Sequence, residues 1–222
     1  MCGRYALTLP QDAMVALFDA LPDNDLPATP RYNICPTQDV HAVTSEAGAR
    51  RLRALRWGLV PFWAEAPGDG PLMINARAET IAQKPAFRDA VRKRRCLIPA
   101  SGFYEWTKDE EGNRLPWYFS AEAPLAFAGI WQDWTKGEAP LTSCAIVTCA
   151  SEGPMTGLHH RTPVVIAPED WPLWLGEAED GKAAPLMRPP PEGLLRWHRV
   201  GREVNSNRAR GEGLIEPLEG AG

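Results

Sequence analysis

Long apolar segments are missing from this sequence. No stretch approaches the roughly 18 uninterrupted apolar residues that a membrane-spanning helix needs, and the N-terminus lacks the charged and apolar leader that directs secretion. We therefore expect no membrane anchor and an intracellular, cytoplasmic location.

The cysteine pattern of a zinc site or a disulfide framework is also missing. The cysteines number five, which is odd, and no two of them form a Cys-x-x-Cys pair. We expect no metal and no cofactor, and we interpret four of the five as buried apolar residues. These four are Cys35, Cys96, Cys144 and Cys149.

There are no internal repeats and no glycine-rich phosphate loop, so neither a Rossmann nor a P-loop nucleotide site is indicated. The net charge of −4 argues against a protein that coats nucleic acid non-specifically. The charge is uneven: residues 1–107 hold 13 Lys and Arg against 11 Asp and Glu, and the remainder holds 11 against 17. The N-terminal half is thus the one suited to face phosphate.

The remaining composition is that of an ordinary globular protein. The chain has 222 residues, of which 44% are hydrophobic and 23% charged. We see no linker, and we expect a single domain over residues 1–222 with a disordered tail after about residue 217. The 22 prolines and 19 glycines predict many turns and irregular connections.

Apolar residues at helical spacing predict helices over residues 10–20, 85–94 and 168–175, and Ser151 is expected to cap a short helix over residues 151–157. Alternating residues 39–45 and 50–57 predict a hairpin. Further strands are predicted over residues 72–80, 95–99, 103–106, 116–120, 125–131, 141–149, 164–167, 194–200 and 204–206, with a turn at Ala100-Ser101-Gly102.

The N-terminus carries the most distinctive chemistry of the chain. Removal of Met1 would leave Cys2 with a free α-amine and a thiol on adjacent carbons, both partly deprotonated near neutrality. A 1,2-aminothiol reacts with aldehydes: the amine forms an imine and the thiol closes it to a thiazolidine. Gly3 allows close backbone approach, and Arg4 is expected to lower the thiol pKa or to hold a phosphate. The alternative is that Cys2 is simply a small residue at a frayed terminus.

Polar residues within apolar segments mark further candidates. Asn75 and Arg77 are two residues apart and should lie on one strand face. Glu105 lies between two aromatic residues, which should raise its carboxyl pKa and make it a proton donor. His159 and Arg161 precede an apolar strand, a position typical of an active-site edge.

Six short motifs occur in one order and together resemble the SRAP family of SOS-response-associated peptidases, or abasic-site processing proteins. They extend over nearly the whole chain, from Cys2 to about Pro217. The motifs are Cys2-Gly3-Arg4-Tyr5, Arg31-Tyr32-Asn33, Trp57-Gly58-Leu59-Val60-Pro61, Asn75-Ala76-Arg77-Ala78-Glu79, Cys96-Leu97-Ile98-Pro99 with Gly102-Phe103-Tyr104-Glu105-Trp106, and His159-x-Arg161-x-Pro163.

The resemblance implies an α+β fold with curved, barrel-like antiparallel β-sheets flanked by helices. It implies a monomer that crosslinks itself to the aldehyde of abasic sites in single-stranded DNA through a reversible thiazolidine. Lyase activity and autoproteolytic maturation stay open. The implied catalytic residues are Cys2, Asn75, Glu105 and His159, and the implied DNA-binding residues are Arg4, Asn33, Trp63, Arg77 and Arg161.

Two details of the motifs depart from the family pattern. His160 has no role in the pattern, so which of the two neighbouring imidazoles acts is open. Trp63 is followed by Ala64, where some relatives carry a second tryptophan. Two other functions stay open as well: a cysteine peptidase or N-terminal-nucleophile amidohydrolase, and a non-catalytic single-strand binding module.

Overall fold

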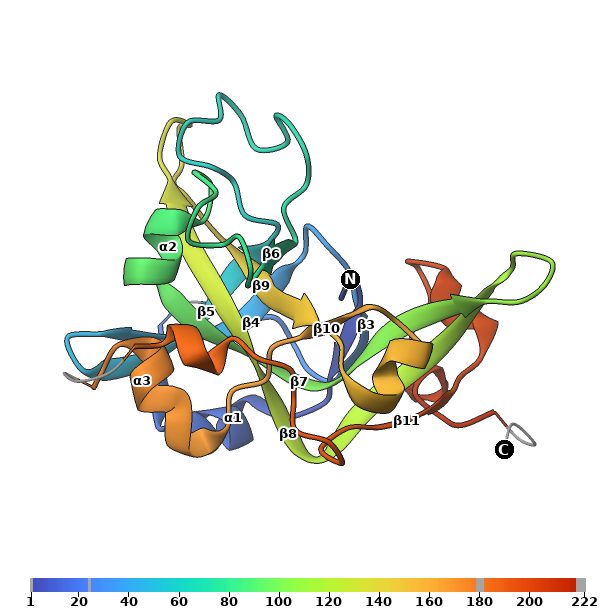
Figure 1. The fold of residues 1–222 in the computed structure, drawn as a ribbon. Coiled ribbons are helices and arrows are strands. Elements are labelled where there is room, and N and C mark those ends of the chain that lie inside the picture. The colour runs from blue at the N-terminus through green and yellow to red at the C-terminus, as the bar shows by residue number, and fades with distance from the viewer. Residues whose placement is uncertain (1, 24, 179–181, 219–222) are drawn as a thin grey trace.

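The computed structural model describes residues 2–23, 25–178 and 182–218. Within this part, eleven strands join in one hydrogen-bonded sheet and the helices are few and short (Figure 1). The end of the predicted disordered tail, residues 219–222, lies outside the described residues. The strands are β1 (Tyr5–Leu7), β2 (Ala20–Pro22), β3 (Arg31–Ile34), β4 (Asp39–Glu46), β5 (Ala49–Trp57), β6 (Asn75–Arg77), β7 (Arg95–Lys108), β8 (Arg114–Trp134), β9 (Leu141–Ala150), β10 (Arg161–Pro163) and β11 (Arg196–Arg199).

Five of these strands close into a ring. β4 pairs with β5 and β7, β8 pairs with β7 and β9, and β5 completes the ring by pairing with β9. The β5–β9 pair is parallel, as are β2–β5 and β6–β9, so the sheet contains parallel neighbours among its mostly antiparallel pairs. The predicted α+β class and curved, barrel-like sheet are confirmed, although the ring is uneven.

β7 and β8 extend beyond the ring as a two-stranded arm, on the right in Figure 1. The predicted turn at residues 100–102 is wrong, because β7 runs without a break from Arg95 to Lys108. The pairing of β7 with β8 shifts instead: Ala100 lies opposite Leu125, and Gly102 lies opposite Ser120. Residues 121–124 of β8 therefore form a bulge, and the two predicted strands over residues 116–120 and 125–131 are one bent strand.

The helices pack against strands of the sheet. They are α1 (Gln11–Phe18), α2 (Arg88–Lys93) and α3 (Trp171–Leu175), with 3-10 turns η1 (Gly153–Gly157), η2 (Pro168–Asp170), η3 (Ala184–Leu186), η4 (Arg202–Asn205) and η5 (Glu212–Leu214). The helices predicted over residues 10–20 and 85–94 are present in shortened form. Residues 168–175 form η2 followed by α3, and the predicted helix over residues 151–157 is the 3-10 turn η1. Ser151 makes no side-chain cap to η1, a strand is found at β10 rather than over residues 164–167, and residues 204–206 include the end of η4 rather than a strand.

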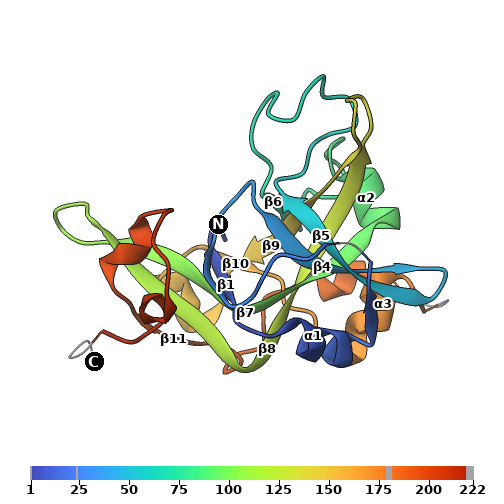
Figure 2. The same cartoon turned by 180° about the vertical axis from the view of Figure 1, so that it is seen from behind.

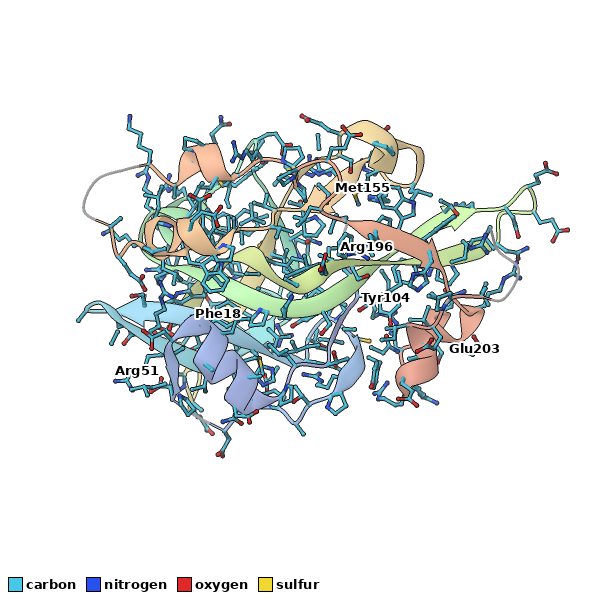
Figure 3. All side chains as sticks on the ribbon, turned by 90° about the horizontal axis from the view of Figure 1, so that it is seen from below. Phe18, Arg51, Tyr104, Met155, Arg196 and Glu203 are labelled. Atoms are coloured by element: carbon cyan, nitrogen blue, oxygen red, sulfur yellow. The ribbon has the colours of Figure 1, made fainter. Side chains whose placement is uncertain are left out.

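Two apolar clusters hold these elements together. The larger cluster fills the interior of the five-stranded ring. In it the side chains of Tyr5 and Trp57 meet edge-on, with 5.3 Å between their aromatic centroids. The smaller packs the segment over residues 200–214 against the arm through Tyr104 and Tyr118. Seen from behind and from below, the C-terminal segment lies along this arm (Figures 2 and 3). The residues that follow β11 thus cover the face of β7 next to the N-terminal segment.

Among the described helices, none combines the length and the apolar character needed to cross a membrane.

Candidate functional site

Pairing between β1 and β7 determines where Cys2 lies. The pairing is antiparallel, with Tyr5 opposite Phe103. Continuing this register away from the ring carries Cys2 toward the part of β7 that holds Glu105. The Cys2 side chain and backbone are fully buried, so the residue does not belong to a frayed terminus.

Burial changes the chemistry of this cysteine. Desolvation, followed by the negative charge of Glu105, raises the pKa of the Cys2 thiol well above its ordinary value. Arg4 does lower this pKa, through its backbone rather than through its charge, but burial raises it by more. The thiol is protonated in this state and needs a proton acceptor before it can act as a nucleophile.

Asn75 reaches Cys2 from the neighbouring strand. β6 pairs in parallel with β9, and this pairing places Asn75 opposite Ile146. Its Nδ2 atom donates a hydrogen bond of 2.9 Å to the backbone carbonyl oxygen of Cys2. Its Oδ1 atom is buried and has no hydrogen-bond partner among the described residues. Asn75 thus holds the backbone of the cysteine and keeps a buried acceptor for another group.

Glu105 lies on β7 with only 3% of its surface exposed. Burial raises the pKa of its carboxyl group from 4.5 to about 7, as its aromatic neighbours led us to expect. Both protonation states are therefore populated near neutral pH, and the group can donate a proton in one step and accept one in another.

His159 follows η1 and turns its ring toward Glu105. Its backbone N–H donates to the carbonyl oxygen of Met155 at 2.9 Å, and its Nε2 atom lies 3.6 Å from Glu105 Oε2. Its Nδ1 atom lies 3.1 Å from the backbone nitrogen and 2.9 Å from the backbone oxygen of Arg161. Burial lowers the His159 pKa. His160 is exposed beside it, with the two ring centroids 4.5 Å apart.

Arg161 forms an ion pair that the motifs did not indicate. Its guanidinium donates to both carboxylate oxygens of Glu79, from Nη1 at 2.7 Å and from Nη2 at 3.0 Å, and to the carbonyl oxygen of Thr148 at 2.7 Å. The guanidinium lowers the pKa of Glu79 to about 2. Glu79 lies in the turn that directly follows β6, and its place at the end of the Asn75-Ala76-Arg77-Ala78-Glu79 motif is the signal that could have identified it beforehand.

Two of the implied DNA-binding residues are buried together. Arg4 donates from Nη1 to the side chain of Asn33 at 2.7 Å and to the carbonyl oxygen of Val204 at 2.8 Å, and from Nη2 to the side chain of Asn207. Asn33 donates in turn to two backbone carbonyls of residues 206–209. This network anchors the N-terminal segment to the C-terminal segment. Whether Arg4 or Asn33 reaches a phosphate stays a prediction.

Arg77 and Trp63 lie at the surface. Arg77 is exposed at the end of β6 and Asn75 is half-buried, whereas Ala76 between them is buried, so the two polar residues lie on one strand face as predicted. Trp63 is 42% exposed and lies edge-on to Phe62, which is 58% exposed. Phe62 is thus the second exposed aromatic residue of this loop, on the side of Trp63 away from Ala64.

A cavity of the protein lies elsewhere. It has a volume of about 640 Å³ and lies between η1 and residues 188–197, with Met155 and Trp197 among its lining residues. None of the four candidate catalytic residues lines it. Among the described residues, no group of three or more His, Cys, Asp or Glu side chains is placed to hold a metal ion. Cys2, Asn75, Glu105 and His159 thus lie together at one place in the fold, with Cys2 and Glu105 buried and Asn75 and His159 half-buried.

Comparisons with known proteins agree with the order of the motifs. A family model described as SOS response associated peptidase (SRAP) matches residues 1–207. The abasic site processing protein YoqW of Bacillus subtilis strain 168 is 34% identical, over 97% of this chain and 99% of its own length. YedK of Escherichia coli K12, also named an abasic site processing protein, is 28% identical over 98% of this chain and 100% of its own length.

A crystal structure of a Bacteroides thetaiotaomicron protein superposes with a TM-score of 0.85 at 22% identity, over 98% of this chain and 100% of that one. At this level of identity the similarity concerns the fold.

Proposed function

The chain belongs to the SOS response associated peptidase (SRAP) family, and we propose that it captures abasic sites in single-stranded DNA by forming a covalent bond through Cys2. A role in abasic-site processing follows from its relatives, several of which carry that name. The observation that supports the covalent step is the contact network around Cys2, in which Asn75 holds the cysteine backbone and Glu105 lies close enough to alter the thiol pKa.

The reaction requires the amine and the thiol of one residue. After Met1 is removed, the α-amine of Cys2 adds to the sugar aldehyde, and the resulting carbinolamine loses water to give an imine. The sulfur then adds to the imine carbon while the thiol proton is transferred to nitrogen. One aldehyde and one aminothiol thus give one thiazolidine and one water, without any oxidant or reductant.

Glu105 is suited to move the protons in this sequence. Its pKa of about 7 allows the acid form to protonate the departing hydroxyl group and the carboxylate form to accept the thiol proton. The Cys2 thiol depends on such an acceptor because burial keeps it protonated. We assign His159 to assist Glu105, since its Nε2 atom faces the carboxylate.

Asn75 orients the nucleophile in this proposal. Its Nδ2 atom holds the Cys2 carbonyl, and its buried Oδ1 atom is free to accept a hydrogen bond from the cysteine amine or from a sugar hydroxyl. Correct orientation of two reacting groups is one of the larger contributions to enzymatic rates.

The exposed side chains supply the contacts to the strand. Arg77 is available for a phosphate, and Trp63 with Phe62 offers aromatic faces on which bases can stack. The burial of Arg4 and Asn33 favours an anchoring role for both.

The test is incubation with an oligonucleotide that carries one abasic site, followed by denaturing electrophoresis and intact-mass measurement. We expect an adduct with a mass that corresponds to loss of Met1 from the protein and loss of one water on crosslinking. Cys2→Ala should abolish it, and Cys35→Ala, which also removes a buried thiol, should retain it. Equal crosslinking by Cys2→Ala would overturn the proposal.

The same experiment separates the competing functions. An acylated Cys2 trapped with a peptide substrate, without any DNA adduct, would indicate a peptidase. Equal and salt-sensitive affinity for intact and abasic strands, again without an adduct, would indicate a binding module. A shortened DNA strand would show that lyase activity accompanies capture.

A further inference from the structure

Glu79 connects three segments around the candidate site. It belongs to the segment that begins with Asn75, and its Oε1 atom accepts a hydrogen bond of 3.2 Å from the backbone N–H of Ala150 at the end of β9. Both of its oxygens bind the guanidinium of Arg161 on β10. One carboxylate thus ties the strand that carries Asn75 to the strand that follows His159.

Arg161 also contacts the imidazole of His159 through its backbone. Its backbone nitrogen and oxygen both lie within 3.1 Å of His159 Nδ1, so the position of the Arg161 backbone determines the orientation of the ring. The opposite ring nitrogen, Nε2, is the atom that faces Glu105. A displacement of Arg161 would therefore change the distance between His159 and the carboxylate that transfers protons.

The same ion pair limits what Arg161 can offer to DNA. Arg161 is only 8% exposed, and its guanidinium is already neutralised by a bidentate carboxylate and bonded to the Thr148 carbonyl oxygen. Arg77, two residues before Glu79, is exposed. In the structure, the accessible positive charge of this region therefore belongs to Arg77 rather than to Arg161.

We propose that Glu79 is a positioning residue for His159, and that through Arg161 it controls the rate of the covalent step rather than the affinity for DNA. This inference rests on the proposed function. It predicts that loss of the Glu79 carboxylate lowers the rate of crosslinking but not the affinity for DNA, whereas a general loss of structure would lower both.

The decisive variant is Glu79→Gln, which retains the shape of the side chain but leaves only one oxygen for Arg161. At saturating abasic oligonucleotide, we expect the single-turnover rate of adduct formation to fall by about tenfold, because small misplacements of catalytic groups cost factors of this size or more. Affinity for an intact single strand of the same sequence, which cannot crosslink, should stay the same or become tighter, since Arg161 is released to bind phosphate.

Glu152→Gln is the matched control. Glu152 is an exposed acid two residues after Ala150, and its loss changes the net charge of this region equally without touching Arg161. We expect this variant to crosslink at the wild-type rate. Glu79→Asp, which retains the charge on a shorter side chain, should give a rate between those of wild type and Glu79→Gln. If thermal unfolding shows that Glu79→Gln is not folded, Glu79→Asp provides the test.

A folded Glu79 variant that reacts within about twofold of the wild-type rate would overturn the inference, as would a parallel fall in rate and affinity. These results differ from failure of the proposed function, in which the wild-type protein itself would form no adduct.

Discussion

Asn75 and Cys2 are 73 positions apart in the chain and are joined by a hydrogen bond of 2.9 Å from Nδ2 to the backbone carbonyl oxygen. This bond fixes the backbone of the proposed nucleophile relative to the sheet. It is made by a side chain on β6, a strand of only three residues that β9 holds in place.

Asn75→Ala should therefore slow adduct formation while leaving DNA binding unchanged. We expect a fall of about tenfold to a hundredfold in the single-turnover rate, because the amine and thiol lose their fixed orientation. A quenched time course on denaturing gels measures it. Asn113→Ala, at the exposed tip of the arm, serves as the control. A wild-type rate for Asn75→Ala would contradict the assigned role.

The pH dependence of crosslinking should reveal Glu105. Burial raises its pKa to about 7, so its acid form is lost as the pH rises through neutrality. The α-amine, with a pKa near 8, gains reactivity over the same range, and the two effects together give a bell-shaped profile. Glu105→Gln should lower the rate and remove the inflection near pH 7. If the inflection persists in this variant, another group is responsible for it.

Trp63 and Arg77 should affect DNA binding in different ways. Trp63→Ala should weaken affinity for single-stranded DNA by about 1–3 kcal/mol, the usual value of one stacked base, without altering the salt dependence.

Arg77→Gln should reduce the slope of log affinity against log salt by about one. Fluorescence anisotropy titrations at several salt concentrations measure both. Leu21→Ala, at an exposed residue of β2, is the control.

His41 should make the protein sensitive to acid. The side chain is fully buried on β4, and burial lowers its pKa from 6.5 to about 4. Neither ring nitrogen makes a hydrogen bond of regular geometry within the described residues, although the Pro27 carbonyl lies close enough to act on the ring. Because the pKa is lower in the folded state, this residue's contribution to stability is complete above about pH 6.5 and is lost as the pH falls toward 4.

Replacing this histidine with an apolar residue should remove the sensitivity. We expect His41→Leu to raise the melting temperature, and to raise it more at pH 5 than at pH 8, since Leu carries no buried polar group. Thermal unfolding at the two pH values measures the difference. His198→Leu, which removes a hydrogen bond of 2.8 Å to Ile215, should instead destabilise the protein. If His41→Leu changed the melting temperature equally at both pH values, His41 would not be the source of the acid sensitivity.

Local sequence patterns were sufficient to predict several features of this protein. The hairpin of β4 and β5 follows from alternating residues and a short turn, and both are properties of neighbouring residues. The direction of the Glu105 pKa shift was predicted correctly from its apolar context, although its cause in the structure is burial by the folded chain. The reactive potential of Cys2 needs only the amine and the thiol of one residue.

Gly102 shows where local patterns fail. Its sequence context, Ala-Ser-Gly, is typical of a turn, yet the residue lies within β7. A Cβ atom at this position would meet the backbone oxygen of Phe119 and the ring of Tyr118 at 2.4 Å. The glycine is therefore needed for close contact with a strand that comes later in the chain, and no local signal distinguishes that need from a turn.

By itself, the sequence determined the chemical groups of this protein and the elements formed by near neighbours. The tertiary structure decided which of those groups meet: it buried Arg4 against the C-terminal segment, paired Arg161 with Glu79, and placed Glu105 beside His159. The physical reason is that solvation and charge pairing depend on strands far apart in sequence, and their register is established only when the sheet closes.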